Sequence, residues 1–140
     1  MSLRHCGIVC EDLSKMIEFY KLLGFEKYID NEIKGSFISE LLGVFNANVK
    51  IVKLKSIKDG SIIELLKYKY KNNSRDKQEL FEQGLSHIAL TVDNLDEVFE
   101  TLTLKGVKFI SPPLFSEKDK VKVCFCKDVE QNFIELVEDI

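Results

Sequence analysis

Short apolar runs alternate with amphipathic stretches along this chain, and the same order of elements occurs twice. Each copy begins with an apolar run, HCGIVC from His5 or HIALTV from His87, followed by Asp12 or Asn94, residue types that commonly cap a helix N-terminus. Apolar residues then recur at the i, i+3, i+4 and i+7 spacing of a helix with one buried face. They are Leu13, Met16, Ile17 and Tyr20 in the first copy, and Leu95, Val98, Phe99 and Leu102 in the second. Both copies therefore predict a strand followed by a helix.

Sliding the chain against itself by 82 residues aligns these two stretches without a gap. The shift places His5 on His87, and Gly24 on Gly106, glycines suited to the left-handed conformation that follows a helix end. The other aligned pairs are Asp12 with Asn94, Leu13 with Leu95, Glu18 with Glu100, and Leu22 with Leu104. An internal repeat of this kind indicates one structural unit used twice.

The later part of each copy aligns at a shift of 71 residues, which places Val52 on Val123 and Glu64 on Glu135. The first copy thus carries 11 extra residues, which must lie between Gly24 and Val49. The remaining apolar runs predict strands at about 25–30, 48–54 and 61–68, and at about 107–110, 120–126 and 132–138. We predict an α+β fold in which two tandem βαβββ modules form a curved mixed-sheet cup with helices outside.

The extra residues of the first copy include the segment SFISELLGVF. Within it Phe37, Ile38, Leu41 and Leu42 suit a short amphipathic helix ended by Gly43. One interpretation is an additional packing turn. The other is a lid in which Phe37, Leu41 and Phe45 cover a substrate cleft and exclude water.

A polar and charged stretch separates the two copies. We predict a single domain over residues 1–140, with module one at 1–68, a linker at 69–84 and module two at 85–140. The basic side chains of this region suit a solvated linker, or alternatively the docking of a phosphate-bearing substrate. They are Lys67, Lys69, Lys71, Arg75 and Lys77.

Composition narrows the function mainly by exclusion. A formal charge of −3 and a pI near 5.5 provide no basic field for nucleic acid. No apolar run approaches the roughly 20 residues of a membrane helix, and the N-terminus lacks the apolar core of a signal peptide, so we expect a cytoplasmic protein without a membrane partner. The cysteines, which lack CxxC spacing, are expected to be buried thiols, with a thiol-sensitive surface or a second metal site as alternatives. They are Cys6, Cys10, Cys124 and Cys126.

The residues that carry chemistry are the histidines and glutamates that the repeat aligns. The sequence has 2 histidines, His5 and His87, and both start the first strand of a module. Because side chains alternate along a strand, each histidine lies opposite the apolar face that packs under the helix. Glu64 and Glu135 lie in apolar strands, where an ionised carboxylate needs a compensating partner. A cation provides one, so the matched set of four predicts a metal site.

This pattern resembles the vicinal-oxygen-chelate superfamily, which includes glyoxalase I, methylmalonyl-CoA epimerase, extradiol dioxygenases, and fosfomycin- and bleomycin-resistance proteins. The resemblance covers essentially the whole chain. It is carried by RHCGIVCEDLSKMIEFYKLLGF, SIIELLKY, GLSHIALTVDNLDEVFETLTLKGVKF, SPP and FCKDVEQNFIELVE. Family members place one metal ligand on the first and last strands of each module, which carries over to His5, Glu64, His87 and Glu135. The set of two His and two Glu resembles bacterial glyoxalase I, with methylmalonyl-CoA epimerase as a near relative.

The resemblance implies one divalent ion, Zn, Ni, Co, Mn or Fe, and a small-molecule substrate with two neighbouring oxygens. Glu135, with Glu64 as its symmetric partner, would move a proton through an enediolate or enolate in a lyase or isomerase reaction. The alternatives are an extradiol-type dioxygenase and a non-catalytic protein that binds a small molecule such as an antibiotic. A homodimer is expected, and the modules could pair within one chain or between two.

Two departures from bacterial glyoxalase I bear on the substrate and on a turn. Val9 stands where an arginine usually serves glutathione, and LLKYKYK follows the first glutamate where an asparagine does so. The resemblance therefore implies a substrate other than lactoylglutathione. The usual DPDGN turn before the last strand is here DVEQN, from Asp128 to Asn132.

Overall fold

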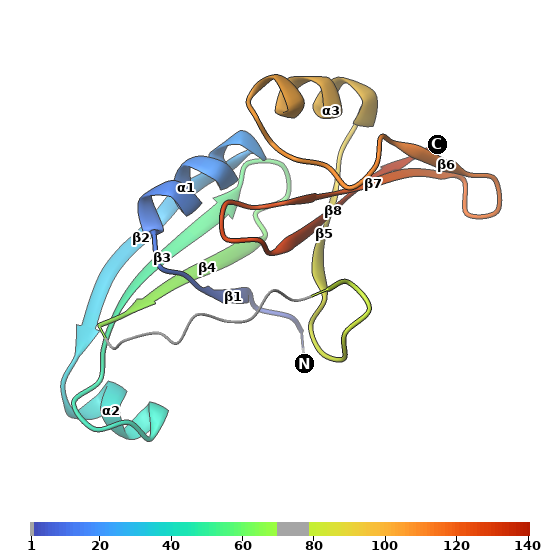
Figure 1. Ribbon diagram of the computed structural model, residues 1–140. Coiled ribbons are helices and arrows are strands. Elements are labelled where there is room, and N and C mark those ends of the chain that lie inside the picture. Colours follow the sequence, from blue (N-terminus) through green and yellow to red (C-terminus); the bar gives the residue numbers. More distant parts are fainter. Residues whose placement is uncertain (1, 70–78) are drawn as a thin grey trace. The chain divides into compact units, whose positions relative to one another are not determined.

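Two four-stranded mixed sheets and three helices make up residues 2–69 and 79–140, the part of the chain that this computed structural model describes (Figure 1). The first half contains β1 (Cys6–Val9), α1 (Leu13–Leu22), β2 (Phe25–Lys34), α2 (Ser36–Leu42), β3 (Asn48–Ser56) and β4 (Ile62–Tyr68). The second half contains β5 (His87–Thr91), α3 (Leu95–Leu104), β6 (Leu114–Ser116), β7 (Val121–Lys127) and β8 (Phe133–Asp139). None of these helices combines the length and apolar character needed to cross a bilayer.

The two sheets have the same topology, with strand orders β1-β4-β3-β2 and β5-β8-β7-β6. In each sheet the first strand runs parallel to the last, and the other pairs are antiparallel. The chain divides into two compact units, Met1–Ser74 and Arg75–Ile140. The predicted α+β fold with tandem βαβββ modules is confirmed. The module boundaries stay a prediction. Residues 70–78 of the predicted linker lie outside the described residues, and they include Lys71, Arg75 and Lys77.

Equivalent caps begin and end the two long helices. The side chains of Asp12 and Asn94 each accept a hydrogen bond of 3.1 Å from the backbone N–H three residues later. This satisfies one of the amides that a helix start leaves without an internal partner. Past the other ends, Gly24 has φ 82° and Gly106 has φ 84°, in the left-handed region that glycine adopts without strain. The repeat in sequence is thus a repeat in local geometry.

The apolar face of each long helix packs against one face of its own sheet. In the first unit Met16, Phe19 and Tyr20 of α1 are buried, and in the second Leu95 and Leu102 of α3. The residues buried with them include Cys10, just after β1, and the strand residues Val52, Leu54, Ile63 and Leu65 in the first unit, and Cys124, Cys126, Ile134 and Leu136 in the second. Three of the four cysteines are therefore buried thiols, as expected, and Cys6 is half-buried.

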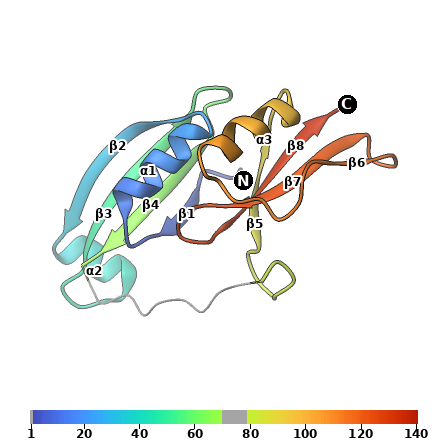
Figure 2. The same cartoon turned by 45° about the horizontal axis from the view of Figure 1, so that its top comes forward.

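The short helix α2 packs on the opposite face of the first sheet from α1. Its Ile38 forms a buried cluster with Ala47 and Val49, joined by partly buried residues of the strands. These are Ile33, Ile51, Leu66 and Tyr68. Both views place α2 at the far end of β2 and β3 from the turn that follows α1 (Figures 1 and 2). The predicted helix and its ending at Gly43, which has φ 65°, are confirmed.

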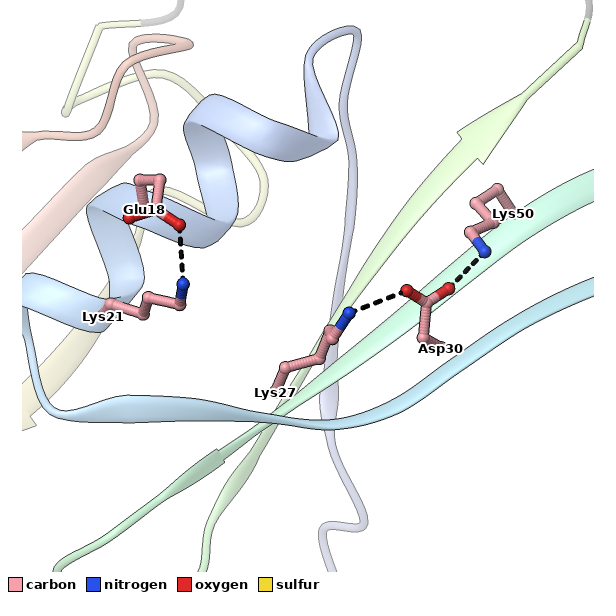
Figure 3. A network of polar contacts seen from close by, with 5 residues as sticks. All are labelled: Glu18, Lys21, Lys27, Asp30 and Lys50. Carbon is pink, nitrogen blue, oxygen red and sulfur yellow. Dashed lines mark hydrogen bonds and ion pairs between the residues drawn. The ribbon is translucent and has the colours of Figure 1, made fainter.

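Exposed ion pairs decorate the α1 side of the first sheet (Figure 3). Lys21 bonds Glu18 at 2.6 Å on α1, and Asp30 of β2 accepts from Lys27 at 3.0 Å and also pairs with Lys50 of β3. The two lysines hold the pKa of the Asp30 carboxyl below its usual value. Such solvent-exposed pairs contribute about 0–1 kcal/mol each.

Two details of the predicted strands were wrong. The run 107–110 makes an isolated bridge, between Phe109 and Cys126, and the regular strand beside β7 is β6. Pro112 and Pro113 explain the interruption, because proline has no N–H to donate to a ladder. The alignment of Val52 with Val123 was also one residue out: Val52 pairs with Leu65 and Cys124 with Leu136, so Val52 corresponds to Cys124.

Candidate metal centre

Each unit brings one predicted histidine next to one predicted glutamate by the same strand register. Gly7 of β1 pairs with Glu64 of β4, and His5 lies two residues before that glycine. Ala89 of β5 pairs with Glu135 of β8, and His87 lies two residues before that alanine. Because residues two apart share a strand face, histidine and glutamate project from the same side of their sheet in both units.

The two pairs are close and half-buried. His5 Nε2 lies 3.6 Å from Glu64 Oε1, with 28% and 12% of the side chains exposed. His87 Nε2 lies 3.2 Å from Glu135 Oε2, with 34% and 24% exposed. Both distances suit neighbouring ligands of one ion, since metal–donor bonds of about 2.0–2.2 Å at angles of about 90–110° place the donors roughly 2.8–3.6 Å apart. Neutral imidazole and carboxylate are donors that first-row divalent ions bind.

Each unit supplies two of the four predicted ligands. Within either unit, no group of three or more His, Cys, Asp or Glu side chains is found among the described residues. A four-ligand centre from His5, Glu64, His87 and Glu135 would therefore draw two donors from each unit. It stays a prediction, supported by the matching geometry of the two pairs.

The imidazole of His87 is oriented by two neighbours. Ser86 Oγ lies 2.8 Å from Nδ1, and the ring of Phe125 meets the imidazole edge to face at a centroid distance of 5.3 Å. When Nδ1–H donates to the serine hydroxyl, Nε2 keeps its lone pair on the side of Glu135. A partner on the second nitrogen of this kind fixes the ring plane and the tautomer of metal-binding histidines.

Lys53 makes the first pair different from the second. It lies directly opposite Glu64 across β3 and β4, and its Nζ is 3.1 Å from Glu64 Oε2. The corresponding position opposite Glu135 is Phe125, an uncharged residue. Sequence reasoning missed Lys53 because the one-residue misalignment of β3 hid its place opposite the glutamate. The available signal was a lysine between buried Val52 and Leu54 in the run VKIVKLK.

The predicted lid residues are exposed. The exposed fractions are 70% for Phe37, 66% for Leu41 and 95% for Phe45. Through Ile38, α2 packs on the sheet face that also bears Glu64, because Val49 and Ile51 share their strand face with Lys53. The lid therefore stays a prediction. Helix α2 lies on the sheet face that bears Glu64, which is the face that such a lid would have to cover.

The turn before β8 holds Glu135's strand in place through a buried aspartate. Asp128 is 2% exposed, and one of its oxygens accepts bonds of 2.9 Å from the backbone N–H groups of Glu130 and Asn132. Its other oxygen accepts 2.8 Å from the Asn132 amide. Gln131 has φ 72°, a conformation that costs a side chain about 1 kcal/mol and that glycine adopts freely. The turn thus keeps its aspartate chemistry despite the missing glycine.

A duplicated βαβββ unit, with a histidine where the first strand begins and a glutamate on the last strand, defines a protein of the vicinal-oxygen-chelate class. Residues 4–137 match the model of the Glyoxalase/Bleomycin resistance protein/Dioxygenase superfamily. The chain belongs to this superfamily.

Solved structures with the same fold cover nearly the whole chain. A glyoxalase family protein from Bacillus cereus superposes with a TM-score of 0.88 at 21% identity, covering 99% of this chain and 93% of that one. A glyoxalase family protein from Enterococcus faecalis has a TM-score of 0.71 at 22% identity, covering 98% and 97%. A superfamily member from Sphaerobacter thermophilus has a TM-score of 0.70 at 23% identity, covering 99% and 98%. A comparison with curated proteins gave no match. At these identities the similarity establishes the fold.

Proposed function

We propose that the chain is a divalent-metal-dependent lyase or isomerase of glyoxalase I type, acting on a small molecule with two neighbouring oxygens. His5, Glu64, His87 and Glu135 would hold the ion. The observation that carries the proposal is the pair of histidine–glutamate contacts, 3.6 Å and 3.2 Å, made by the same register in the two sheets. A half-buried carboxylate beside an imidazole on an open strand face serves packing poorly but suits a cation.

The proposed ligands and their neighbours have different roles in the reaction. When bound, a divalent ion would supply Lewis-acid polarisation of two substrate oxygens. Glu135 is the proton carrier, because among the described residues its side chain pairs with the His87 imidazole, whereas Glu64 also pairs with an ammonium. A carboxylate that is not held by an ammonium can approach a substrate C–H and accept its proton. Ser86 holds the His87 ring in position.

The residues around Glu64 argue against a glutathione adduct as the substrate. On the same strand face lie Gly7 and Val9 of β1, Ile51 of β3 and Leu66 of β4. The cation beside them on this face is Lys53, and its ammonium is paired with Glu64. The other residues offer none for a glutathione carboxylate, and Val9 stands where the arginine of glutathione-dependent relatives would be. A methylglyoxal adduct of a small thiol, or an acyl thioester of the methylmalonyl-CoA type, is the preferred class.

The second candidate is an extradiol-type dioxygenase, and the Lys53–Glu64 contact favours it. If the Lys53–Glu64 ion pair stayed intact when metal bound, the remaining donors would be His5, His87 and Glu135. Two histidines and one carboxylate with open positions are the donor set of non-haem iron(II) oxygenases. Consumption of O₂ with a catechol by the iron-loaded protein would select this candidate over the first.

Metal analysis of protein purified without chelators tests both. We expect close to one divalent ion per chain by elemental analysis, lost in a His5→Ala/His87→Ala double variant whose circular dichroism is unchanged. A panel of methylglyoxal with several thiols, methylmalonyl-CoA and catechol then separates the activities. Failure of the protein to bind Zn²⁺, Ni²⁺, Co²⁺, Mn²⁺ or Fe²⁺ at stoichiometric levels would reject the metal centre, leaving a metal-free small-molecule binder.

A further inference from the structure

Lys53 places a fixed positive charge on one of the proposed metal ligands. Its Nζ lies 3.1 Å from Glu64 Oε2, while His5 Nε2 lies 3.6 Å from Oε1, so both carboxylate oxygens have a partner. The contact is sheltered, with 23% of the Lys53 side chain and 12% of the Glu64 side chain exposed. Charges interact more strongly in such a site than in water, because the effective dielectric constant is lower.

Strand pairing makes this contact a built feature of the sheet. Lys53 and Glu64 are direct cross-strand partners within an unbroken antiparallel register that runs from Val49 with Tyr68 to Lys55 with Ile62. Side chains that face each other in this way have their Cβ atoms about 4.5–5.5 Å apart. The ammonium therefore has little freedom to lie far from the carboxylate without leaving the strand face.

In the second unit an uncharged residue stands at the equivalent position. Phe125 occupies the corresponding place opposite Glu135, and its ring packs against the imidazole of His87. A cation approaching Glu135 meets an aromatic ring, whereas a cation approaching Glu64 meets an ammonium. The two otherwise matched pairs differ in the charge that a metal ion must face.

We propose that Lys53 is an internal competitor for the metal, which the ion must displace from Glu64 before that carboxylate can become a ligand. The inference rests on the proposed function, since it concerns the four-ligand centre. It makes Lys53 a positioning residue that sets how tightly the fourth ligand binds. A metal ion held by His5, His87 and Glu135 would gain Glu64 as a further ligand only at the cost of its lysine contact.

Replacing Lys53 by methionine keeps an unbranched side chain one atom shorter and removes its charge. We expect Co²⁺, titrated calorimetrically into metal-free protein, to bind Lys53→Met on the order of tenfold more tightly than the original chain, about 1.4 kcal/mol. Lys53→Arg retains the charge and should not tighten binding. Lys50→Met is the matched control, because Lys50 lies on the same strand, pairs with Asp30 on the helix side and is far more exposed (Figure 3).

Thermal melts distinguish this role from a purely structural one through the gain in stability that Co²⁺ gives each variant. Metal-free Lys53→Met should melt below the original chain, because Glu64 loses its counter-charge, and should gain more stability on adding Co²⁺. The inference would be overturned if Lys53→Met bound Co²⁺ no more tightly than the original chain. If the original chain still bound Co²⁺ and His87→Ala did not, the proposed metal centre would stand. Absence of Co²⁺ binding from every variant would overturn both.

Discussion

Lys53 and Phe125 occupy the same place in the two sheets, each directly opposite the glutamate of its own last strand. One supplies an ammonium 3.1 Å from Glu64, and the other an aromatic edge against His87. The duplicated fold is therefore asymmetric beside the residues proposed to bind metal. Under the proposed function this asymmetry would separate the tasks of the two glutamates: Glu64 is paired with a counter-charge, and Glu135 would carry the proton.

Replacing Glu135 by glutamine should abolish turnover while metal is partly retained. The amide keeps an oxygen donor for the ion but cannot accept a proton from carbon, so kcat should fall by a factor of about 10²–10⁴. Elemental analysis and steady-state kinetics on the same preparation measure the two effects. Retention of activity in this variant would show that another group is the base. Glu64→Gln serves as the matched comparison and should weaken metal binding more than it lowers kcat of the loaded enzyme.

Removing the hydroxyl of Ser86 should loosen the metal. Without the 2.8 Å contact to Nδ1, the His87 ring loses its fixed plane and tautomer. Loss of such a supporting partner typically costs 10–100-fold in metal affinity, and we expect about tenfold for Ser86→Ala by competition with a chromophoric chelator. Ser111→Ala, which changes a half-buried serine bonded to the neighbouring Pro112 carbonyl, should leave the affinity unchanged. Equal affinities for the two variants would remove Ser86 from the centre.

Replacing Gln131 by glycine should stabilise the protein. Gln131 holds φ 72° in the turn before β8, and glycine removes the steric cost of that conformation. The gain should be at most about 0.5 kcal/mol after the greater flexibility of glycine in the unfolded chain is subtracted. Urea denaturation measures it as a higher midpoint with the same slope. Glu130→Gly, at a neighbouring turn position where φ is not positive, should instead lower the midpoint.

The thiols should differ sharply in reactivity. Burial raises the pKa of Cys124 to about 11 and that of Cys126 to about 12, so both stay protonated at pH 8, and the thiolate is the reacting form. Burial also raises the pKa of Cys6, which is half-buried and more accessible. Iodoacetamide at pH 8 should therefore label Cys6 first in native protein, and Cys124 and Cys126 after unfolding in urea. Mass spectrometry of digested samples checks the order, and early labelling of Cys126 would contradict its burial.

The helix caps and the repeat were predictable from sequence because they are local. Asp12 and Asn94 bond an amide three residues away, and Gly24 and Gly106 end their helices in nearly the same conformation. Such features depend on a few consecutive residues, so the sequence predicts them directly. The same holds for the strand periodicity that turns each histidine away from the helix.

The contacts across strands were predictable in part. That His5 would lie near Glu64, and His87 near Glu135, followed from the repeat and is what each sheet shows. That Lys53 would lie on Glu64 did not follow, because the shift between β3 and β7 differs by one residue from the shift between β4 and β8. A slip of one residue exchanges the two faces of a strand, so sequence alignment alone cannot assign a cross-strand neighbour.

By itself the sequence determined the duplicated βαβββ order, the caps and the four residues proposed to bind metal. These rest on periodicity and on residue types at equivalent positions. The tertiary structure decided which charges meet those residues: the lysine on Glu64, the aromatic ring and serine on His87, and the aspartate that closes the turn before β8. The physical reason is that strand register is set by long-range pairing, and a carboxylate's chemistry depends on the few ångströms around it.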